Sequence, residues 1–163
     1  MTRASESFYY DEKPLPRLGI EDLDLYAFQY YLKKTEQDNL GIDNQRLLRS
    51  WRLLAGDHPT IAGLVLFGKA PQEHLPFAQV NAFRFPGTDS SGDPSDGKEL
   101  KGQLLEVIDQ AERFLNLHLP IPRQIRGFEP EAKPELPSAA LREAVVNAVA
   151  HRDYTVQGAS RLL

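Results

Sequence analysis

The sequence predicts an α+β fold in which a small central sheet is packed by several helices. Two segments of strand length, at residues 61–67 and 78–85, are rich in apolar side chains. Three longer segments, near residues 20–36, 43–55 and 99–118, repeat apolar side chains at helical spacing. Helices packed on a small sheet are one of the few layer arrangements that bury both kinds of apolar surface.

The composition fits one or two globular units, because 41% of the 163 residues are hydrophobic and 26% are charged. The net charge of −4 argues against a free-standing nucleic-acid-binding domain, which usually has a basic surface. The absence of cysteine excludes disulfides, a thiolate nucleophile and a zinc–thiolate site. No apolar run approaches the roughly 18 residues of a membrane span. The N-terminus has no apolar signal core, so we expect a cytoplasmic protein without membrane contact.

The N-terminal part predicts an extended arm followed by two helices. Residues 1–17 are polar and interrupted by prolines, which is typical of an extended segment. The first helix begins among acidic residues and ends at Lys33 and Lys34, as the helix dipole favours. The second helix follows Asp43.

Three arginines, Arg46, Arg49 and Arg52, lie along the outer side of the second helix. They form the best candidate surface for DNA or another anion. The alternative is a solvated helix face, which is the commoner role of such a row.

The apolar run at residues 61–67 is nearly continuous and predicts a strand buried on both faces. It also contains the pattern of a phosphate-binding loop, Gly-x-x-x-x-Gly-Lys, at Gly63, Gly68 and Lys69. We reject such a loop here. The four intervening residues are bulky and apolar, and Ala70 stands where Ser or Thr would bind magnesium.

A central domain over residues 18–135 is completed by the strand at 78–85, a mobile loop at 86–98, the helix at 99–118 and a third strand at 123–129. Residues 130–137 form a linker. We expect the core to contain Trp51, Leu66, Phe83, Ile108 and Leu115.

The last helix contains the candidate functional residues. Ser138 follows a proline and predicts the N-cap, and the next thirteen residues contain no helix breaker. Apolar side chains surround most of this helix, so we expect burial on more than one side. Glu143, Asn147 and His151 follow one another at four-residue spacing within that surface. A buried carboxylate is costly unless something specific pairs with it, which makes Glu143 a functional candidate.

Residues 143–148 read Glu-x-x-x-Asn-Ala, and residues 141–154 read Leu-Arg-Glu-Ala-Val-Val-Asn-Ala-Val-Ala-His-Arg-Asp-Tyr. The first pattern resembles the N-box of GHKL (Bergerat-fold) ATPases. The longer string resembles the start of the ATPase-like domain in bacterial proteins that also carry a Schlafen-type AlbA-like DNA-binding domain. These are often described as RecG-related ATP-dependent DNA helicases or transcriptional regulators. Upstream strings such as Pro-Thr-Ile-Ala-Gly-Leu-Val-Leu-Phe-Gly-Lys-Ala-Pro and Phe-Arg-Phe-Pro-Gly are similar to the same family.

This resemblance implies that Glu143 is the general base, that Asn147 binds magnesium, and that His151 lies at the nucleotide. It implies ATP and Mg²⁺ as cofactors of the full-length protein, and DNA as a partner through a domain upstream of this chain. Residues 136–163 would then be the N-box helix and first strand of a truncated GHKL-like domain. Its adenine-binding box and lid would follow Leu163, so we expect this chain alone to be inactive.

Two alternatives stay open. The chain is a non-catalytic linker or oligomerisation scaffold of a DNA-binding regulator, in which Glu143 caps or pairs internally, for example with Arg142 or Arg152 of a neighbour. Otherwise it is an unrelated small enzyme using His151 and Asp153, which the kinase-like order His-Arg-Asp suggests. That order lacks the Asn and the glycine-rich loop that kinases need.

Overall fold

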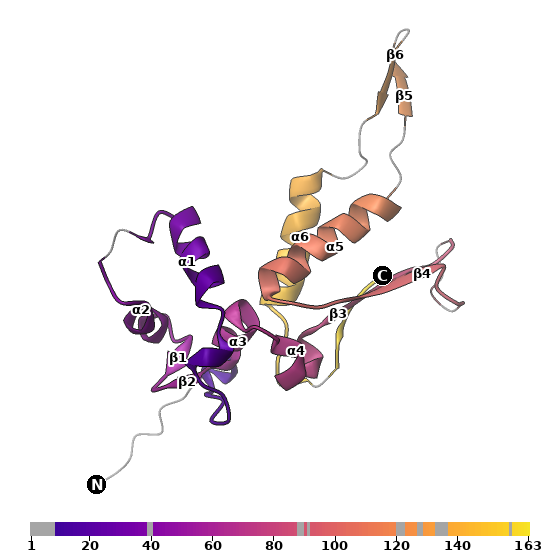
Figure 1. Cartoon of the computed structure of the whole chain (residues 1–163). Coiled ribbons are helices and arrows are strands. Elements are labelled where there is room, and N and C mark those ends of the chain that lie inside the picture. Colours follow the sequence, from indigo (N-terminus) through magenta and orange to yellow (C-terminus); the bar gives the residue numbers. More distant parts are fainter. Residues whose placement is uncertain are drawn as a thin grey trace. The chain divides into compact units, whose positions relative to one another are not determined.

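The structure is a computed structural model and describes residues 9–38, 41–87, 90, 92–119, 123–126, 129–132, 137–156 and 158–163 (Figure 1). The fold is α+β, as predicted. The chain divides into two compact units, which are described separately. The first comprises Met1–Ala78, Gly102–Leu104 and Tyr154–Gln157, and the second comprises Gln79–Lys101, Leu105–Asp153 and Gly158–Leu163. No helix in the described part of the chain is long and apolar enough to span a membrane.

The first unit is mainly helical. Its elements in chain order are the 3₁₀ helices η1 (Tyr10–Glu12) and η2 (Ile20–Asp22), the helices α1 (Leu25–Lys34) and α2 (Asn44–Ser50), the short strands β1 (Leu54–Ala55) and β2 (His58–Pro59), the helices α3 (Ile61–Phe67) and α4 (Pro71–His74), and the 3₁₀ helix η4 (Pro76–Ala78). The first two predicted helices are present but shorter than the predicted 20–36 and 43–55, because residues 20–22 form η2 and residues 54–55 form β1. The Asp24 carboxylate accepts from the N–H groups of Tyr26 and Ala27, and Asp43 caps α2 in the same way.

An aromatic cluster forms the core around α1. The Phe28 ring is fully buried and lies edge-on to the rings of Trp51 (5.6 Å) and Phe67 (5.1 Å). Leu32, one turn after Phe28, is buried in the same cluster. Edge-to-face aromatic pairs stabilise a core beyond the area they bury. This cluster therefore joins α1, the end of α2 and the end of α3.

The segment Ile61–Phe67 is the helix α3, so the predicted buried strand is wrong. Thr60 caps this helix: its hydroxyl accepts from the N–H of Gly63 and donates to the carbonyl of Arg52. Five of the seven helical residues are buried, which explains the lack of periodicity in the sequence. A continuous apolar run cannot distinguish a buried strand from a short buried helix.

The two glycines of the apparent phosphate-binding pattern have a packing role. Gly63 lies inside α3, where a Cβ atom would come within 2.0 Å of the carbonyl oxygen of Leu53. Gly68 ends the helix, and its N–H donates to the carbonyl of Leu64. The residues between them form a helix rather than a loop whose N–H groups curl around a phosphate.

Helices α1 and α2 end in the same motif, with a non-glycine residue in the left-handed region. Glu36 has φ +58° and Arg52 has φ +59°. After α1, the N–H of Gln37 donates to the carbonyl of Leu32; after α2, the N–H of Leu53 donates to the carbonyl of Leu48. These 6→1 hydrogen bonds define Schellman motifs, in which glycine usually takes the left-handed position.

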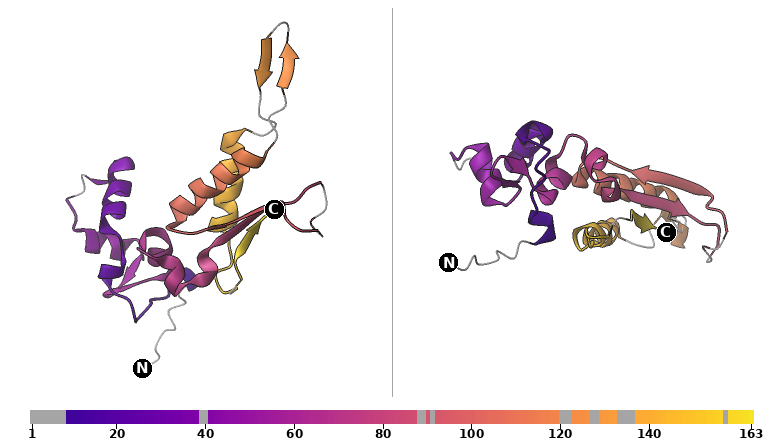
Figure 2. Two further views of the ribbon diagram at one scale, coloured as in Figure 1. Left: turned by 45° about the vertical axis from the view of Figure 1, so that its right-hand side comes forward. Right: turned by 90° about the horizontal axis from the view of Figure 1, so that it is seen from below.

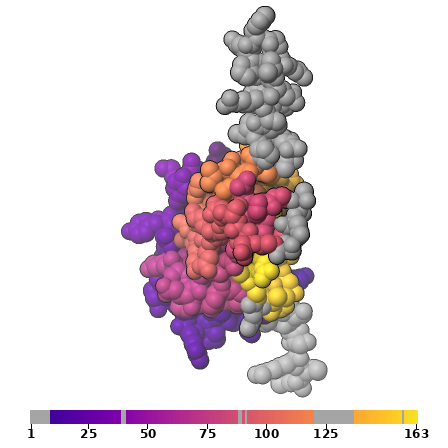
Figure 3. All heavy atoms as spheres, turned by 90° about the vertical axis from the view of Figure 1, so that its right-hand side faces the viewer, coloured from indigo at the N-terminus to yellow at the C-terminus, as the bar shows by residue number. Residues whose placement is uncertain are grey.

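The second unit contains a three-stranded sheet, two helices and a hairpin (Figure 2). Its elements are the strands β3 (Val80–Arg84) and β4 (Asp96–Leu100), the helix α5 (Leu104–His118), the hairpin strands β5 (Arg123–Arg126) and β6 (Glu129–Ala132), the helix α6 (Ser138–Ala150) and the strand β7 (Ser160–Leu162). In the order β4–β3–β7, β3 is antiparallel to β4 and parallel to β7. The C-terminal residues (yellow) reach the surface in Figure 3, and Leu163 is 70% exposed.

The strand predicted at 78–85 is confirmed by β3, and a strand, β7, follows the last helix within residues 136–163, as expected. Two boundaries were wrong. Residues 99 and 100 belong to β4 rather than to the following helix, and the predicted loop 86–98 therefore ends in a strand. The predicted third strand at 123–129 is replaced by the hairpin β5–β6, which also takes in the start of the predicted linker. Residues 88, 89 and 91 of the predicted loop lie outside the described residues, as do residues 1–8 of the predicted arm.

Only one of the five predicted core residues is fully buried. Ile108 is 3% exposed, whereas Trp51, Leu66, Phe83 and Leu115 are half-buried. In α5 the buried positions are Val107, Ile108, Ala111 and Phe114. The buried face of α5 therefore includes Phe114 in place of the predicted Leu115.

Candidate functional site

Helix α6 carries the predicted site residues. It begins one residue earlier than predicted, because Pro137 is the N-cap and its carbonyl accepts from the N–H groups of Ala140 and Leu141. Ser138 is the first helical residue and gives no side-chain cap, so its predicted role is wrong. The helix ends at Ala150, where the N–H of His151 donates to the carbonyl of Asn147 at 3.0 Å.

The burial of α6 differs from the prediction. Val145 and Val149 are buried and Leu141 is half-buried, which makes a single apolar stripe at four-residue spacing. Ala144 and Ala148 are exposed, so the helix is not buried on several sides. The prediction failed because alanine is compatible with both a core and a solvated helix face.

Glu143, Asn147 and His151 are all exposed in the described chain. Glu143 is therefore not a buried carboxylate, and the argument from an unpaired buried charge does not apply. The structure does bring Glu143 and Asn147 together on one helix face. Four residues of α-helix separate them, which corresponds to a rise of about 6 Å. Their carboxylate and amide oxygens are accessible to a ligand approaching this face.

Carboxylate and amide oxygens are hard donors of the type that Mg²⁺ accepts. Within the described ranges, no group of three or more His, Cys, Asp or Glu side chains is placed to hold a metal ion. Magnesium usually keeps several waters and takes only one or two protein oxygens beside the oxygens of a phosphate. The pair Glu143 and Asn147 fits that kind of shared coordination.

The arginines that flank the candidate residues are bound to other groups. The Arg142 guanidinium lies 2.8 Å from Asp109 Oδ1 and 2.6 Å from Glu112 Oε2, both on α5. Hydrogen bonds to Asp109 and then to Glu112 raise the pKa of Arg142 above its ordinary value. Arg152 donates to the Ser160 hydroxyl at 2.7 Å and to the carbonyl of Gly158. The pairing of Glu143 with Arg142 or Arg152 of a neighbour stays a prediction.

His151 and Asp153, the residues of the alternative enzyme hypothesis, are both exposed just beyond the end of α6. His151 is the C-cap residue. Sequence reasoning missed Asp109 and Glu112, the carboxylates that bind α6 to α5. The spacing of Asp109 and Glu112, three residues apart on one helix, was a usable signal for a shared cationic partner.

Two of the three arginines that follow Asp43 form ion pairs, whereas Arg46 is exposed. Arg49 lies 3.0 Å from Asp57, and its Nε donates to the carbonyl of Gly56. Arg52 lies 2.7 Å from Glu12, and this hydrogen bond raises the pKa of Arg52. A guanidinium already bound to a carboxylate is a poor phosphate ligand. The row is therefore mainly a set of surface ion pairs.

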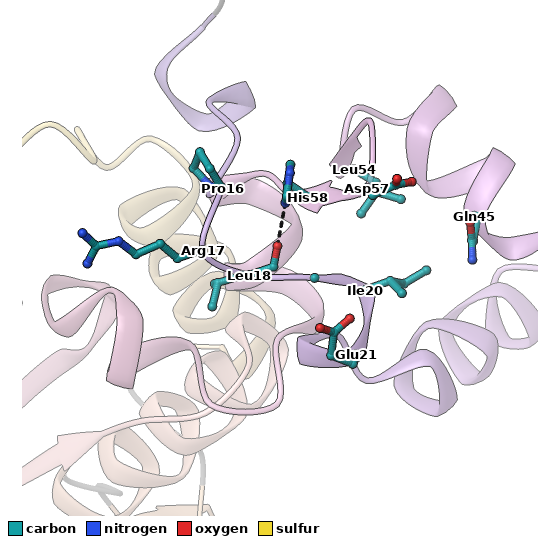
Figure 4. Close-up of a pocket in the computed structure, with 10 residues that line it drawn as sticks. Pro16, Arg17, Leu18, Ile20, Glu21, Gln45, Leu54, Asp57 and His58 are labelled. Carbon is teal, nitrogen blue, oxygen red and sulfur yellow. Dashed lines mark hydrogen bonds between the residues drawn. The ribbon is translucent and has the colours of Figure 1, made fainter.

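A groove of about 550 Å³ lies in the first unit (Figure 4). Residues 16–21 line it together with Gln45, Leu54, Asp57 and His58. The Nδ1 atom of His58 lies 2.8 Å from the carbonyl oxygen of Leu18. Because a carbonyl only accepts, Nδ1 carries the proton in this hydrogen bond. No sequence motif pointed to this groove, whose residues come from three separate segments.

The fold and these surfaces are those of an α+β protein with an exposed carboxylate–amide pair on its last helix. The profile of the domain of unknown function DUF8451 matches residues 1–82, which is half of the chain. The chain belongs to this family. No curated protein sequence matches the chain.

One solved structure similar to this chain is that of the DIP2311 protein from Corynebacterium diphtheriae. The TM-score is 0.61 at 21% sequence identity, and the alignment covers 96% of this chain. At this identity the likeness shows the fold alone. The chain spans 31% of the length of DIP2311.

Proposed function

We propose that this chain supplies helix α6 to a nucleotide-binding regulatory module of a longer, DNA-binding protein related to the RecG-like, Schlafen-type family. The observation that supports this most is the joint exposure of Glu143 and Asn147 on one face of α6. In this proposal Asn147 contributes an amide oxygen to Mg²⁺, and Glu143 orients and deprotonates a water molecule. Bound Mg²⁺ would neutralise phosphate charge. His151, one turn after Asn147, would lie beside the nucleotide.

The residues around this pair suit such a role. The buried stripe of Val145 and Val149 and the pairs formed by Arg142 hold α6 in a defined orientation within its unit. A base and a metal ligand on a rigid helix are held more accurately than on a loop. The nucleotide site is completed by residues outside this chain, and DNA is bound by another domain. Both functions place the protein in the cytoplasm, where ATP and the chromosome occur.

The test uses Glu143→Ala and Asn147→Ala in the full-length natural protein. Glu143→Ala should retain nucleotide binding and lower hydrolysis by about 10²–10⁴-fold, because only the base is lost. Asn147→Ala should weaken binding itself and flatten its dependence on magnesium. Glu73→Ala and Asn116→Ala, at exposed positions on α4 and α5, are the matched controls and should change neither property. ATP affinity, turnover and the melting temperature are measured for all four variants.

The second candidate function is a non-catalytic linker or oligomerisation scaffold of a DNA-binding regulator. The observation in its favour is the exposed aromatic face of α1, where Tyr26 is 86% exposed and Tyr30 is 64% exposed. If the chain is such a scaffold, neither Glu143→Ala nor Asn147→Ala should change nucleotide binding or hydrolysis. Since both side chains are exposed, each substitution should then change stability by less than about 0.5 kcal/mol.

A further inference from the structure

Arg142 joins helix α6 to helix α5, which lies beside it (Figure 1). One nitrogen atom of its guanidinium, Nη1, donates to Asp109 Oδ1 at 2.8 Å and to Glu112 Oε2 at 2.6 Å. The two carboxylates lie three residues apart on α5, so one helix face brings both of them to the same cation. The residue that follows Arg142 is Glu143, the candidate base. This bridge between α5 and α6 is therefore made one residue away from the candidate site.

The apolar contact of α6 leaves the rotation of the helix about its own axis loosely defined. Val145 and Val149 are the buried residues of α6. They lie about 40° apart around the axis, since each residue of an α-helix turns by about 100°. Apolar burial is non-directional, so two valines hold the helix against its unit without fixing its rotation. A directional contact is needed to fix it.

The bridge made by Arg142 is such a directional contact. Arg142 lies about 60° from Val145 around the axis, whereas Glu143 and Asn147 each lie about 160° from Val145, on the far side. A helix with its side chains is about 10–12 Å across, so a rotation of about 20° moves the end of a side chain by roughly 2 Å. A displacement of about 1 Å at a reacting group can lower a rate by about a hundredfold. Small rotations of α6 therefore matter for any chemistry on its exposed face.

We propose that Arg142 is a positioning residue for the nucleotide site on α6. Its bridge to Asp109 and Glu112 sets the rotation of the helix. That rotation places the Glu143 carboxylate and the Asn147 amide on the face that meets the nucleotide. This inference rests on the proposed function, in which these two groups serve a water molecule and Mg²⁺. Arg142 acts through α6 and not on the nucleotide, because its guanidinium binds the carboxylates of α5.

The first experiment measures the rotation of α6 without nucleotide. This chain contains no cysteine, so two introduced cysteines carry spin labels without background labelling. Asn116→Cys and Ala148→Cys place the labels at exposed positions of α5 and α6, and double electron–electron resonance gives the distance distribution between them. Arg142→Met keeps an unbranched side chain but removes the charge, so it should broaden this distribution. Arg142→Lys should leave it nearly unchanged, because a lysine ammonium also donates to two carboxylates.

The second experiment measures ATP turnover by the full-length natural protein, well below its melting temperature. The Arg142 side chain is 44% exposed, and a partly exposed bridge biases the orientation of a helix only moderately. Arg142→Met should therefore lower turnover by about three- to tenfold, and Arg142→Lys should retain most of it. The double variant Asp109→Asn/Glu112→Gln should lower turnover by a similar factor. Adding Arg142→Met to that variant should lower it no further, because all three residues act through one bridge.

Gln110→Ala is the matched control. Gln110 lies on α5 between the two carboxylates in sequence, and its side chain donates to the carbonyl of Lys101 at 2.6 Å. This substitution removes a polar contact of α5 that does not reach α6, so the label distances and the turnover should stay unchanged.

The outcomes separate this inference from the proposed function. A full-length wild-type protein that does not hydrolyse ATP overturns the proposed role of Glu143, and this inference with it. If the wild type hydrolyses ATP, unchanged label distances or unchanged turnover in Arg142→Met overturns this inference alone. Additive losses in the combined variant, or equal losses in Gln110→Ala, overturn it as well.

Discussion

The side-chain amide of Gln72 forms two hydrogen bonds with the backbone of Gly102. Its Nε2 donates to the Gly102 carbonyl at 2.9 Å, and its Oε1 accepts from the Gly102 N–H at 3.0 Å. The same Nε2 donates to the carbonyl of Ala78 at 3.0 Å. Gly102 has φ +120°, a conformation that side-chain-bearing residues rarely adopt. Gln72, near the start of α4, thus holds Gly102 beside the end of η4.

Replacement of Gln72 should destabilise the protein. Gln72→Ala leaves two partly buried carbonyls and one N–H without this partner, which should cost about 1–3 kcal/mol in the free energy of unfolding. Gln72→Glu should cost more, because a carboxylate cannot donate to the two carbonyls and would repel them. Urea denaturation measures both changes. Gln29→Ala, at an exposed position of α1, is the control; a loss as large there would contradict the assigned role of Gln72.

Gly63→Ala should be strongly destabilising. The new methyl group would come within 2.0 Å of the Leu53 carbonyl oxygen, so α3 or the backbone at Leu53 must move. We expect a loss of about 1–3 kcal/mol or more, as for other overpacked cores. Thermal unfolding measures it. Gly92 has no heavy atom within 4 Å of its Cβ position, so Gly92→Ala should be neutral or slightly stabilising. Equal stability of the two variants would show that α3 does not pack as described.

Glu36→Gly should stabilise the protein, although it removes a side chain. Glu36 has φ +58°, and a glycine in this left-handed position avoids a steric penalty. The expected gain in unfolding free energy is about 0.5–1 kcal/mol. Arg52→Gly relieves the same penalty but also removes the ion pair with Glu12, so its gain should be smaller. Glu36→Ala, which retains the penalty, is the control. A loss of stability in Glu36→Gly would mean that the Schellman motif after α1 does not form.

Arg142→Ala should lower the melting temperature in a salt-dependent manner. Its pairs with Asp109 and Glu112 are partly exposed, and screening weakens such pairs as ionic strength rises. The hydrogen bonds to these carboxylates raise the pKa of Arg142, so it stays charged at every working pH. The difference from wild type should therefore shrink between low and high NaCl. Arg113→Ala, also exposed and on α5, should show no such trend.

The sequence predicted those elements whose pattern is local. The spacing of apolar residues located the helices α1, α2, α5 and α6, although the predicted bounds of the first three extended up to five residues beyond the observed ends. β3 was recognised from its β-branched and aromatic residues. β4 was missed because Asp-Gly-Lys-Glu-Leu has no strand propensity of its own. It forms a strand by pairing with β3, a contact that a local pattern does not contain.

The error at Ile61–Phe67 has a similar origin, since burial on all sides removes the periodicity that separates helix from strand. Thr60 was the available signal: a threonine three residues before the glycine whose N–H it accepts is an N-cap pattern. At the candidate site, the spacing of Glu143 and Asn147 on one helix face was predictable. Their exposure was not, because it depends on which elements cover α6 in three dimensions.

The parallel pairing of β3 with β7 also affects how the chain is made on the ribosome. Val80 lies opposite Ser160, which follows it 80 residues later, whereas β4 pairs with β3 after a short connection. During synthesis β3 gains its first neighbour once Leu100 has emerged, and its second only after Leu162. At about 5–20 residues per second this interval lasts roughly 3–12 s. Throughout it, one edge of the central strand has unpaired N–H and C=O groups, a hazard for aggregation that chaperones shield in growing chains.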